Sequence, residues 1–188
     1  MSSRPALSIL PRLVLGLVMQ GLLGGPALAQ DLSIMSDFGM ADFFHDSAQV
    51  IQNGASNRAN ISQSNDLGGS AANYAEIKQD GGENDASITQ NGDQNSARIH
   101  QTGDSNIANI VQTGFANTAD ISQTGFGNAL YSTQTGNNNS IVFSQPGYAT
   151  ANLVEIGNNN SINVTQGVGS TISIRLEGNN LTATVRQN

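Results

Sequence analysis

Apolar and polar residues alternate in short stretches, and these stretches recur every eleven residues along much of the chain. From position 79, four successive units read QDGGENDASIT, QNGDQNSARIH, QTGDSNIANIV and QTGFANTADIS. Each unit opens with Gln, carries Gly two places later, Asn five places later and Ile nine places later. A fixed period with the same residue type at each phase predicts a repeat architecture.

The alternation within a unit predicts one short strand. Alternate residues of a strand face the same side, so Asn84, Ala86, Ile88 and Gln90 would share one face. The Gly-containing residues that follow are typical of a tight corner. A helix is disfavoured, because the apolar positions recur at every second residue and a Gly interrupts every period.

One strand cannot bury its inner face alone, so the units are expected to stack. The sequence predicts an all-β fold, a parallel two-sheet β-solenoid of cross-β type, with about 22 residues per turn and eleven per strand-and-corner unit. The repeat domain spans residues 48–188, with thirteen strands or about six and a half turns. Turns would stack about 4.7–4.9 Å apart, which aligns identical side chains in ladders.

Three sets of inward residues are candidates for these stacking ladders, and a fourth set lies in the corners. The glutamines are Gln52, Gln63, Gln79, Gln90, Gln101, Gln112, Gln123, Gln134, Gln145, Gln166 and Gln187. The asparagines are Asn57, Asn73, Asn84, Asn95, Asn106, Asn117, Asn128 and Asn139. The isoleucines are Ile61, Ile77, Ile88, Ile99, Ile110 and Ile121, and the corner glycines are Gly54, Gly81, Gly92, Gly103, Gly114, Gly125, Gly136 and Gly147. Each amide both donates and accepts, and a buried amide without a partner would cost about 1–3 kcal/mol.

The spacing departs from eleven at three places. Gln63 and Gln79 lie sixteen residues apart, whereas Gln145 to Glu155 and Gln166 to Leu176 span ten residues each. The alternation within the strands is intact, so these length changes belong to corners. If corners alternate between two edges, both shortened corners fall on one edge and the insertion falls on the other.

The units become less regular after Ile141. Glu155 and Leu176 occupy the glutamine phase, and Arg175 and Arg186 appear at outward positions. Terminal repeats are often atypical, so this end is interpreted either as a cap or as a docking end for a surface or partner, with Arg175 and Arg186 as the docking residues.

Two segments precede the repeats. Residues 1–29 are predicted to be a cleaved signal peptide, with Arg4 and Arg12 before an apolar stretch and small residues at positions 27 and 29. Residues 30–47 do not repeat, are acidic and contain three phenylalanines. They are interpreted either as a leader or cap over the first turn, or as a recognition segment for secretion.

Composition and charge narrow the functional classes. The chain has 188 residues, no Cys and a net charge of −7, which disfavours nucleic-acid binding. His45 and His100 lie in unrelated contexts, and the acidic residues are scattered, so neither an enzyme nor a cofactor or metal site is expected. The alternative is a monomeric secreted solenoid that binds a surface ligand such as carbohydrate or ice. That function needs a regular outer face, whereas Arg58, Glu76 and Lys78 show an irregular one.

The unit from Gln101 to Gln112, QTGDSNIANIVQ, resembles the curlin repeat, whose pattern is Q-x-G-x-x-N-x-A-x-x-x-Q. The likeness is close over residues 79–123 and recognisable over residues 48–187. It implies a structural subunit of extracellular curli-type functional amyloid, secreted by a Gram-negative bacterium and polymerising into adhesive biofilm fibres.

The same resemblance implies partners. These are further copies of the chain, a second curlin subunit, an outer-membrane secretion pore and its accessory factors, and residues 30–47 occupy the place of the family's secretion-guiding segment. The regular units fit either the major or the nucleating minor subunit, and the arginines near the end resemble the charged terminal repeat of the minor one.

Overall fold

The computed structural model describes residues 46–64 and 72–187, which form a series of short strands. The strands are β1 (Ser47–Asn53), β2 (Arg58–Ser64), β3 (Tyr74–Asp80), β4 (Asp85–Asp93), β5 (Ser96–Asp104), β6 (Ile107–Phe115), β7 (Thr118–Phe126), β8 (Ala129–Asn137), β9 (Ser140–Gln145), β10 (Thr150–Asn158), β11 (Ser161–Thr165), β12 (Thr171–Asn179) and β13 (Thr182–Arg186). The predicted signal peptide, nearly all of the segment at residues 30–47 and the insertion near residue 66 lie outside the described residues.

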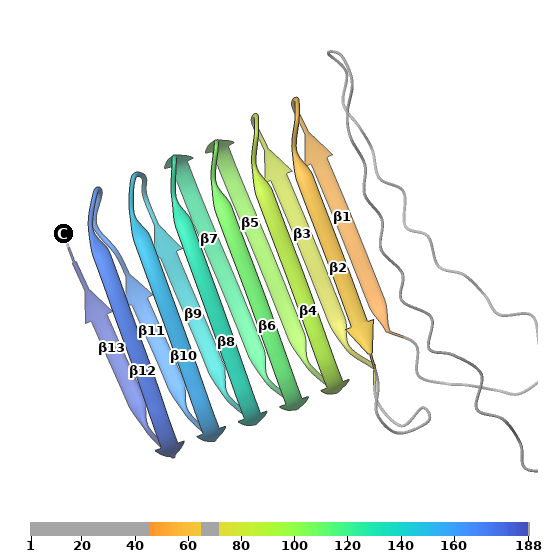
Figure 1. The fold of residues 1–188 in the computed structure, drawn as a ribbon, viewed down its shortest axis with the longest axis vertical. Coiled ribbons are helices and arrows are strands. Elements are labelled where there is room, and N and C mark those ends of the chain that lie inside the picture. Colours follow the sequence, from red (N-terminus) through yellow and green to blue (C-terminus); the bar gives the residue numbers. More distant parts are fainter. Residues whose placement is uncertain (1–45, 65–71, 188) are drawn as a thin grey trace, which may run out of the picture.

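The strands coil alternately into two parallel sheets. The odd-numbered strands form a seven-stranded sheet in the order β1-β3-β5-β7-β9-β11-β13, and the even-numbered strands form a six-stranded sheet from β2 to β12 (Figure 1). In the middle of the coil each residue pairs with the residue 22 positions later, as Ile88 does with Ile110 and Gln90 with Gln112. The predicted all-β, parallel, two-sheet solenoid with about 22 residues per turn is confirmed.

The number of stacked turns is slightly lower than predicted. The described residues contain the thirteen strands expected, but the seven-stranded sheet has six strand-to-strand steps and the six-stranded sheet has five. Only about five turns are therefore stacked on a preceding turn along both sheets. The predicted number of six and a half turns was obtained by counting strands. It is too high for stacked turns, because the first strand of each sheet has no preceding strand to stack on.

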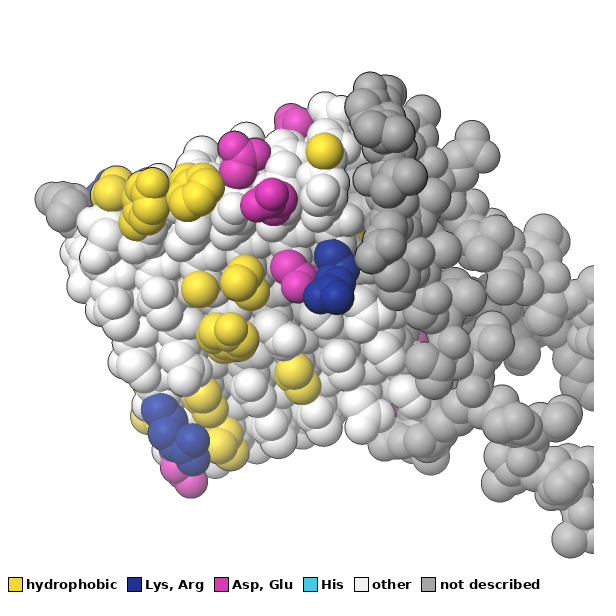
Figure 2. Space-filling model, turned by 45° about the horizontal axis from the view of Figure 1, so that its top comes forward, with side chains coloured by type: hydrophobic (Ala, Val, Ile, Leu, Met, Phe, Trp, Pro, Cys, Tyr) yellow, Lys and Arg dark blue, Asp and Glu magenta, His cyan; other side chains and the backbone are white. Residues whose placement is uncertain are grey.

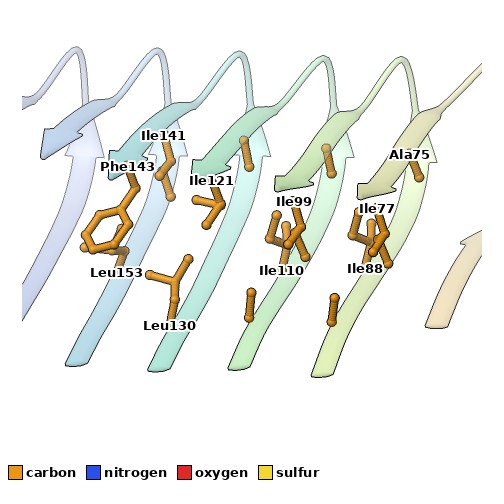
Figure 3. Close-up of a cluster of buried hydrophobic side chains, with 14 of the residues drawn as sticks. Ala75, Ile77, Ile88, Ile99, Ile110, Ile121, Leu130, Ile141, Phe143 and Leu153 are labelled. Carbon is orange, nitrogen blue, oxygen red and sulfur yellow. The ribbon is translucent and has the colours of Figure 1, made fainter. Parts of the chain in front are cut away.

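The apolar core lies between the two sheets. Inward positions of successive strands carry fully buried Ile77, Ile88, Ile99, Ile110 and Ile121, and the row continues with larger groups such as Phe143 and Leu153 (Figure 3). Beside this row, small Ala86 and Ala108 give way to Leu130 in the six-stranded sheet. Each large buried group contributes roughly 1.5–3 kcal/mol. Each sheet contributes its own row: Ile77, Ile99 and Ile121 pair along one sheet, and Ile88 and Ile110 along the other, where Ser132 precedes Leu153.

The corners depend on left-handed backbone conformations. All eight predicted corner glycines have positive φ, from 95° at Gly125 to 137° at Gly147. The glycines also stack closely, since a Cβ on Gly114 would collide with the carbonyl oxygen of Gly136 in the next turn. A second left-handed residue follows two places after most of these glycines, and it need not be Gly, as Ala116 shows with φ of 55°.

The corner lengths follow the alternation of the two edges. The two shortened corners lead out of β9 and β11, which both belong to the seven-stranded sheet. They therefore lie on the same edge, as predicted. The lengthened connection follows β2, a strand of the six-stranded sheet, and its residues 65–71 lie outside the described residues.

Candidate functional site

A continuous row of glutamine side chains runs along the inside of the seven-stranded sheet. The Nε2 of each glutamine donates to the Oε1 of the next along Gln52, Gln79, Gln101, Gln123, Gln145 and Gln166, with N···O distances of 2.6, 2.8, 2.9, 2.8 and 3.0 Å. These side chains are buried, at 5% exposure or less. The ladder therefore satisfies amides that would otherwise be costly to place in a core.

The six-stranded sheet contains a second glutamine ladder. It joins Gln63, Gln90, Gln112 and Gln134 in the same direction, at 2.9, 2.9 and 2.8 Å. The Nε2 of Gln134 then donates to Oε2 of Glu155 at 2.8 Å, which places a carboxyl group in the amide row. Leu176 follows Glu155 in the register of this sheet, and the ladder ends there.

The glutamines also connect the two sheets. Besides its bond along the ladder, Nε2 of Gln112 in β6 donates to the carbonyl oxygen of Ser96 in β5, at 3.1 Å. Nε2 of Gln123 in β7 donates to the carbonyl oxygen of Ile107 in β6, at 2.8 Å. Both amide hydrogens are used, one along the axis and one across the core. Neither Leu nor an ionised Glu can supply these donors.

Two asparagine ladders stand at the corners where the strands begin. The backbone N–H of each asparagine donates to Oδ1 of the preceding one, at 2.9–3.2 Å, along Asn73, Asn95, Asn117, Asn139 and Asn160 and along Asn57, Asn84, Asn106 and Asn128. Nδ2 of Asn106 also donates to the carbonyl oxygen of Gly125 at 3.0 Å. The asparagine backbone N–H groups donate towards the N-terminal end of the solenoid, whereas the glutamine side chains donate towards the C-terminal end.

The structure brings nearly all the predicted ladder residues together, with one exception. Gln187 is not joined to its ladder: its Oε1 has no hydrogen-bond partner, and Nε2 of Gln166 donates instead to the carbonyl oxygens of Thr150 and Ser170. Gln187 follows the short final strand and keeps its phase, since its backbone N–H donates to the carbonyl oxygen of Thr165 at 2.9 Å. Only its side-chain bond to the ladder is missing.

Sequence reasoning missed two asparagine-ladder members, and it placed Glu155 in the glutamine phase without its ladder bond. Oδ1 of Asp46 accepts from the backbone N–H of Asn73 at 2.7 Å, Asn160 extends the same ladder, and Glu155 extends a glutamine ladder. Asp46 stands eleven residues before Asn57, and Asn160 stands two residues before an inward Ile, as Asn139 does. The phase could have identified both residues.

Glu155 is electrostatically unusual. Its side chain is fully buried, and burial raises its pKa to about 7, although the hydrogen bond from Gln134 opposes the shift. Its Oε1 has no hydrogen-bond partner. At this position a glutamine would direct Nε2 at a carbonyl oxygen, so an ionised Glu155 presents an acceptor where the ladder uses a donor.

Hydrophobic, basic and acidic side chains are scattered over the face drawn in Figure 2. The outer surface also carries ion pairs and a short exposed amide ladder from Asn137 through Asn158 to Asn179. Arg175 contacts Glu177 at 3.0 Å, and Arg58 contacts Asp85 at 3.2 Å, in both cases with exposed side chains. Such pairs contribute at most about 1 kcal/mol. Arg186 is exposed in β13. The predicted docking arginines thus lie on the outer faces of the two final strands.

Residues 46–64 and 72–187 contain no candidate metal site and no helix that could cross a membrane. No group of three or more His, Cys, Asp or Glu side chains there is placed to hold a metal ion. No helix in that part of the chain has the length and apolarity needed to cross a membrane.

Comparison with known proteins identifies the repeats. Residues 81–114 and 116–147 match the family model described as the curlin associated repeat, and together these stretches contain β4 to β9. No curated protein and no solved structure matched the chain. The matched stretches are those in which the glutamine and asparagine ladders recur without substitution for most of their length. These two stretches are therefore similar to the curlin associated repeat.

Proposed function

We propose that the chain is a structural subunit of extracellular curli-type amyloid fibres and that it polymerises by adding strands at the ends of the solenoid. The curlin repeat family consists of structural fibre subunits, which supports this role. In this proposal residues 1–29 direct secretion and are removed, residues 30–47 guide the chain through an outer-membrane pore, and the fibre mediates adhesion and biofilm formation.

The pairing of the strands is the observation that carries the proposal. Among the described residues, each strand from β3 to β11 has a parallel partner on both sides, whereas β1, β2, β12 and β13 have a partner on one side only. An open parallel edge presents a row of N–H and C=O groups that another chain can pair with. Cross-β fibres grow by this kind of addition.

Growth by strand addition would also extend the rows of inward side chains. An incoming chain that pairs with an open edge would continue the apolar rows across the junction and present a new edge to the next copy. All strands are parallel and both glutamine ladders donate in one direction, so the two ends of the solenoid differ. The N-terminal end of one copy therefore fits the C-terminal end of another, and the fibre is polar.

The test is fibre formation by the mature chain, residues 30–188. Thioflavin T fluorescence would be followed with and without preformed seeds, and the product examined by fibre diffraction. We expect a lag that seeds remove and a meridional reflection near 4.7–4.8 Å. A monomer with β-type circular dichroism and no fibres over days would refute the proposal and favour a ligand-binding solenoid.

One further assay distinguishes a nucleating minor subunit from a major subunit. As a nucleating subunit, the chain would shorten the lag of a second, fibre-forming curlin when added in small amounts. As a major subunit, it would form the bulk of the fibre by itself at the same concentrations. The regular rungs from β3 to β9 fit both roles.

A further inference from the structure

The described strands are odd in number, and this fixes how a second copy can continue the coil. Strands alternate between the sheets, yet β1 and β13 both belong to the seven-stranded sheet. The next strand after β13 must therefore belong to the six-stranded sheet. We propose that successive copies in the fibre are related by a half-turn about the solenoid axis, so that β1 of an incoming copy pairs with β12 and its β2 pairs with β13. This inference rests on the proposed function.

The two sheets are similar enough to exchange strands in this way. β5 and β6 belong to different sheets, yet both are built from the same eleven-residue unit with Ala, Ile and Gln facing inward. The corners after them place Gly103 and Gly114 in the same phase, with φ of 104° and 117°. A half-turn combined with a half-rung rise therefore superimposes one sheet's repeat on that of the other.

The apolar inner positions match across the proposed junction, whereas Gln52 would lie on Leu176. The eleven-residue phase places Ala48 on Ile172, Val50 on Ile174, Ala59 on Ala183, Ile61 on Val185 and Gln63 on Gln187. Ile172, Ile174 and Leu176 in β12 are only partly buried, as are Ala183 and Val185 in β13, in contrast with the fully buried row in the middle. The incoming strands would cover all five side chains.

The outward residues at the junction are electrostatically compatible. The same alignment places Ile51 opposite Arg175 and Ser62 opposite Arg186. Neither arginine meets a like charge, which would be destabilising directly across a strand pair.

The unrotated arrangement leaves a strand missing. If β1 of the incoming copy paired with β13, its β2 would face β12 across two strand spacings, roughly 9.5 Å. Both edges would then keep unpaired N–H and C=O groups beside a core, and Ile174 would lack a neighbour on that side. The half-turn removes this gap without any change in the fold of either copy.

Cysteine cross-linking distinguishes the two arrangements in a chain that has no native Cys. Gln49, Asn60 and Thr184 are exposed, outward residues of β1, β2 and β13. The half-turn places Asn60 of one copy beside Thr184 of the next, and the unrotated arrangement places Gln49 there. The test compares Asn60→Cys/Thr184→Cys with Gln49→Cys/Thr184→Cys in seeded fibres treated with a short bis-maleimide, using the three single variants as controls for lateral contacts.

We expect a ladder of covalent oligomers on a denaturing gel for the Asn60/Thr184 pair and no more than the single-variant background for the Gln49/Thr184 pair. The reverse pattern, or fibres in which neither pair reacts, would overturn the half-turn. An absence of fibres from the unmodified chain would instead refute the proposed function.

Cryo-electron microscopy of unmodified fibres gives an independent measurement that does not depend on the variants. The half-turn predicts a rotation of about 180° per copy, apart from slow sheet twist, and a rise of about 31 Å, or six and a half rungs. A rise of about 34 Å with no such rotation would show seven rungs per copy. That result would overturn the inference, and it is expected if another segment of the chain supplies the missing strand.

Discussion

The rungs from β3 to β9 and those from β10 to β13 are built on the same backbone with different inner residues. In the first region the glutamine and asparagine phases are filled almost throughout by amides that bond to both neighbours. In the second region Glu155 and Leu176 replace glutamine, and Ala149 and Leu181 stand at asparagine positions. The side chains facing inward from β12 and β13 are only partly buried.

The register survives where the ladders stop. Leu176 pairs with Glu155 in the same phase that joins Glu155 to Gln134, although no amide bond is possible between the first two. Between β10 and β12, alternating apolar residues, the glycine corner and the exposed Asn158–Asn179 amide pair therefore hold the register without the inner glutamine ladder. The amide ladders add stability and directional hydrogen bonding to a register that the backbone already has. Substitutions in the corners and in the ladders separate these two contributions.

The largest effect is expected from a corner glycine of the regular region. A Cβ in Gly114→Ala would collide with the carbonyl oxygen of Gly136, and the backbone on both sides is fixed by strand pairing. We expect the fibre to lose about 4 kcal/mol of stability per copy and to grow much more slowly. The measurements are seeded thioflavin T kinetics and the guanidinium concentration that dissolves half of the fibre.

Gly169→Ala is the matched control in the C-terminal region. Gly169 also has positive φ, at 69°, but beyond its immediate chain neighbours nothing lies within 4 Å of the position that a Cβ would take. The Gly169→Ala variant should lose only about 1 kcal/mol of stability, which is the cost of the left-handed conformation for alanine. Equal effects of the two substitutions would show that the stacking of glycines is not what limits the corner.

The next largest effect is expected from the glutamine ladders. Gln112→Ala removes bonds of 2.9 and 2.8 Å to Gln90 and Gln134 and leaves buried partners unpaired, which should cost about 2–3 kcal/mol. Adding Gln101→Ala interrupts the other ladder as well and should slow seeded growth further. Gln187→Ala, outside the ladder, should cost less than about 1 kcal/mol. Unchanged seeded kinetics in the double variant would contradict a role of the ladders in growth.

Glu155 makes the C-terminal region sensitive to pH. Its pKa in the folded chain is about 7 against an ordinary value of 4.5, so the folded state binds the proton more tightly than the unfolded state. The resulting stability is present in full below pH 4.5, falls as the pH rises towards 7, and is lost above it. The stability lost between pH 4.5 and pH values above 7 amounts to about 3 kcal/mol at most.

Glu155→Gln should remove this dependence. The variant should match the parent chain at pH 4 and exceed it by up to about 3 kcal/mol at pH 8, since the amide also supplies the missing donor. Guanidinium midpoints at pH 4, 6 and 8 measure this difference. Glu83→Gln, at an exposed corner, is the matched control. A parallel pH profile for the parent chain and Glu155→Gln would exclude Glu155 as the cause.

The regular region was predictable because each position of its eleven-residue period carries the same type of residue in nearly every unit. The period gave the strands, the inward rows and the corner glycines, and the changes in spacing placed both shortened corners on one edge. The direction of the amide bonds was not predictable, since a glutamine can donate either way along the axis. The isolation of Gln187 was missed because phase says nothing about where a final strand ends. The second left-handed corner residue was also missed, since its identity varies.

At the second left-handed corner residue, the C-terminal region has the more favourable side chain. Substitutions at this position are expected to have the smallest effect on stability. In corners that lead out of the six-stranded sheet, the regular region has Ala116 with φ of 55°, whereas the corners after β10 and β12 have Asn159 and Asn180 with φ of 57° and 59°. Asn tolerates this conformation better than Ala does. Ala116→Asn should therefore stabilise the fibre by about 0.5–1 kcal/mol, and the reciprocal Asn159→Ala should destabilise it by a similar amount. Guanidinium midpoints that move in opposite directions would show that the degenerate end has the better corner residues, whereas shifts of the same sign would mean that side-chain contacts, not backbone strain, decide this position.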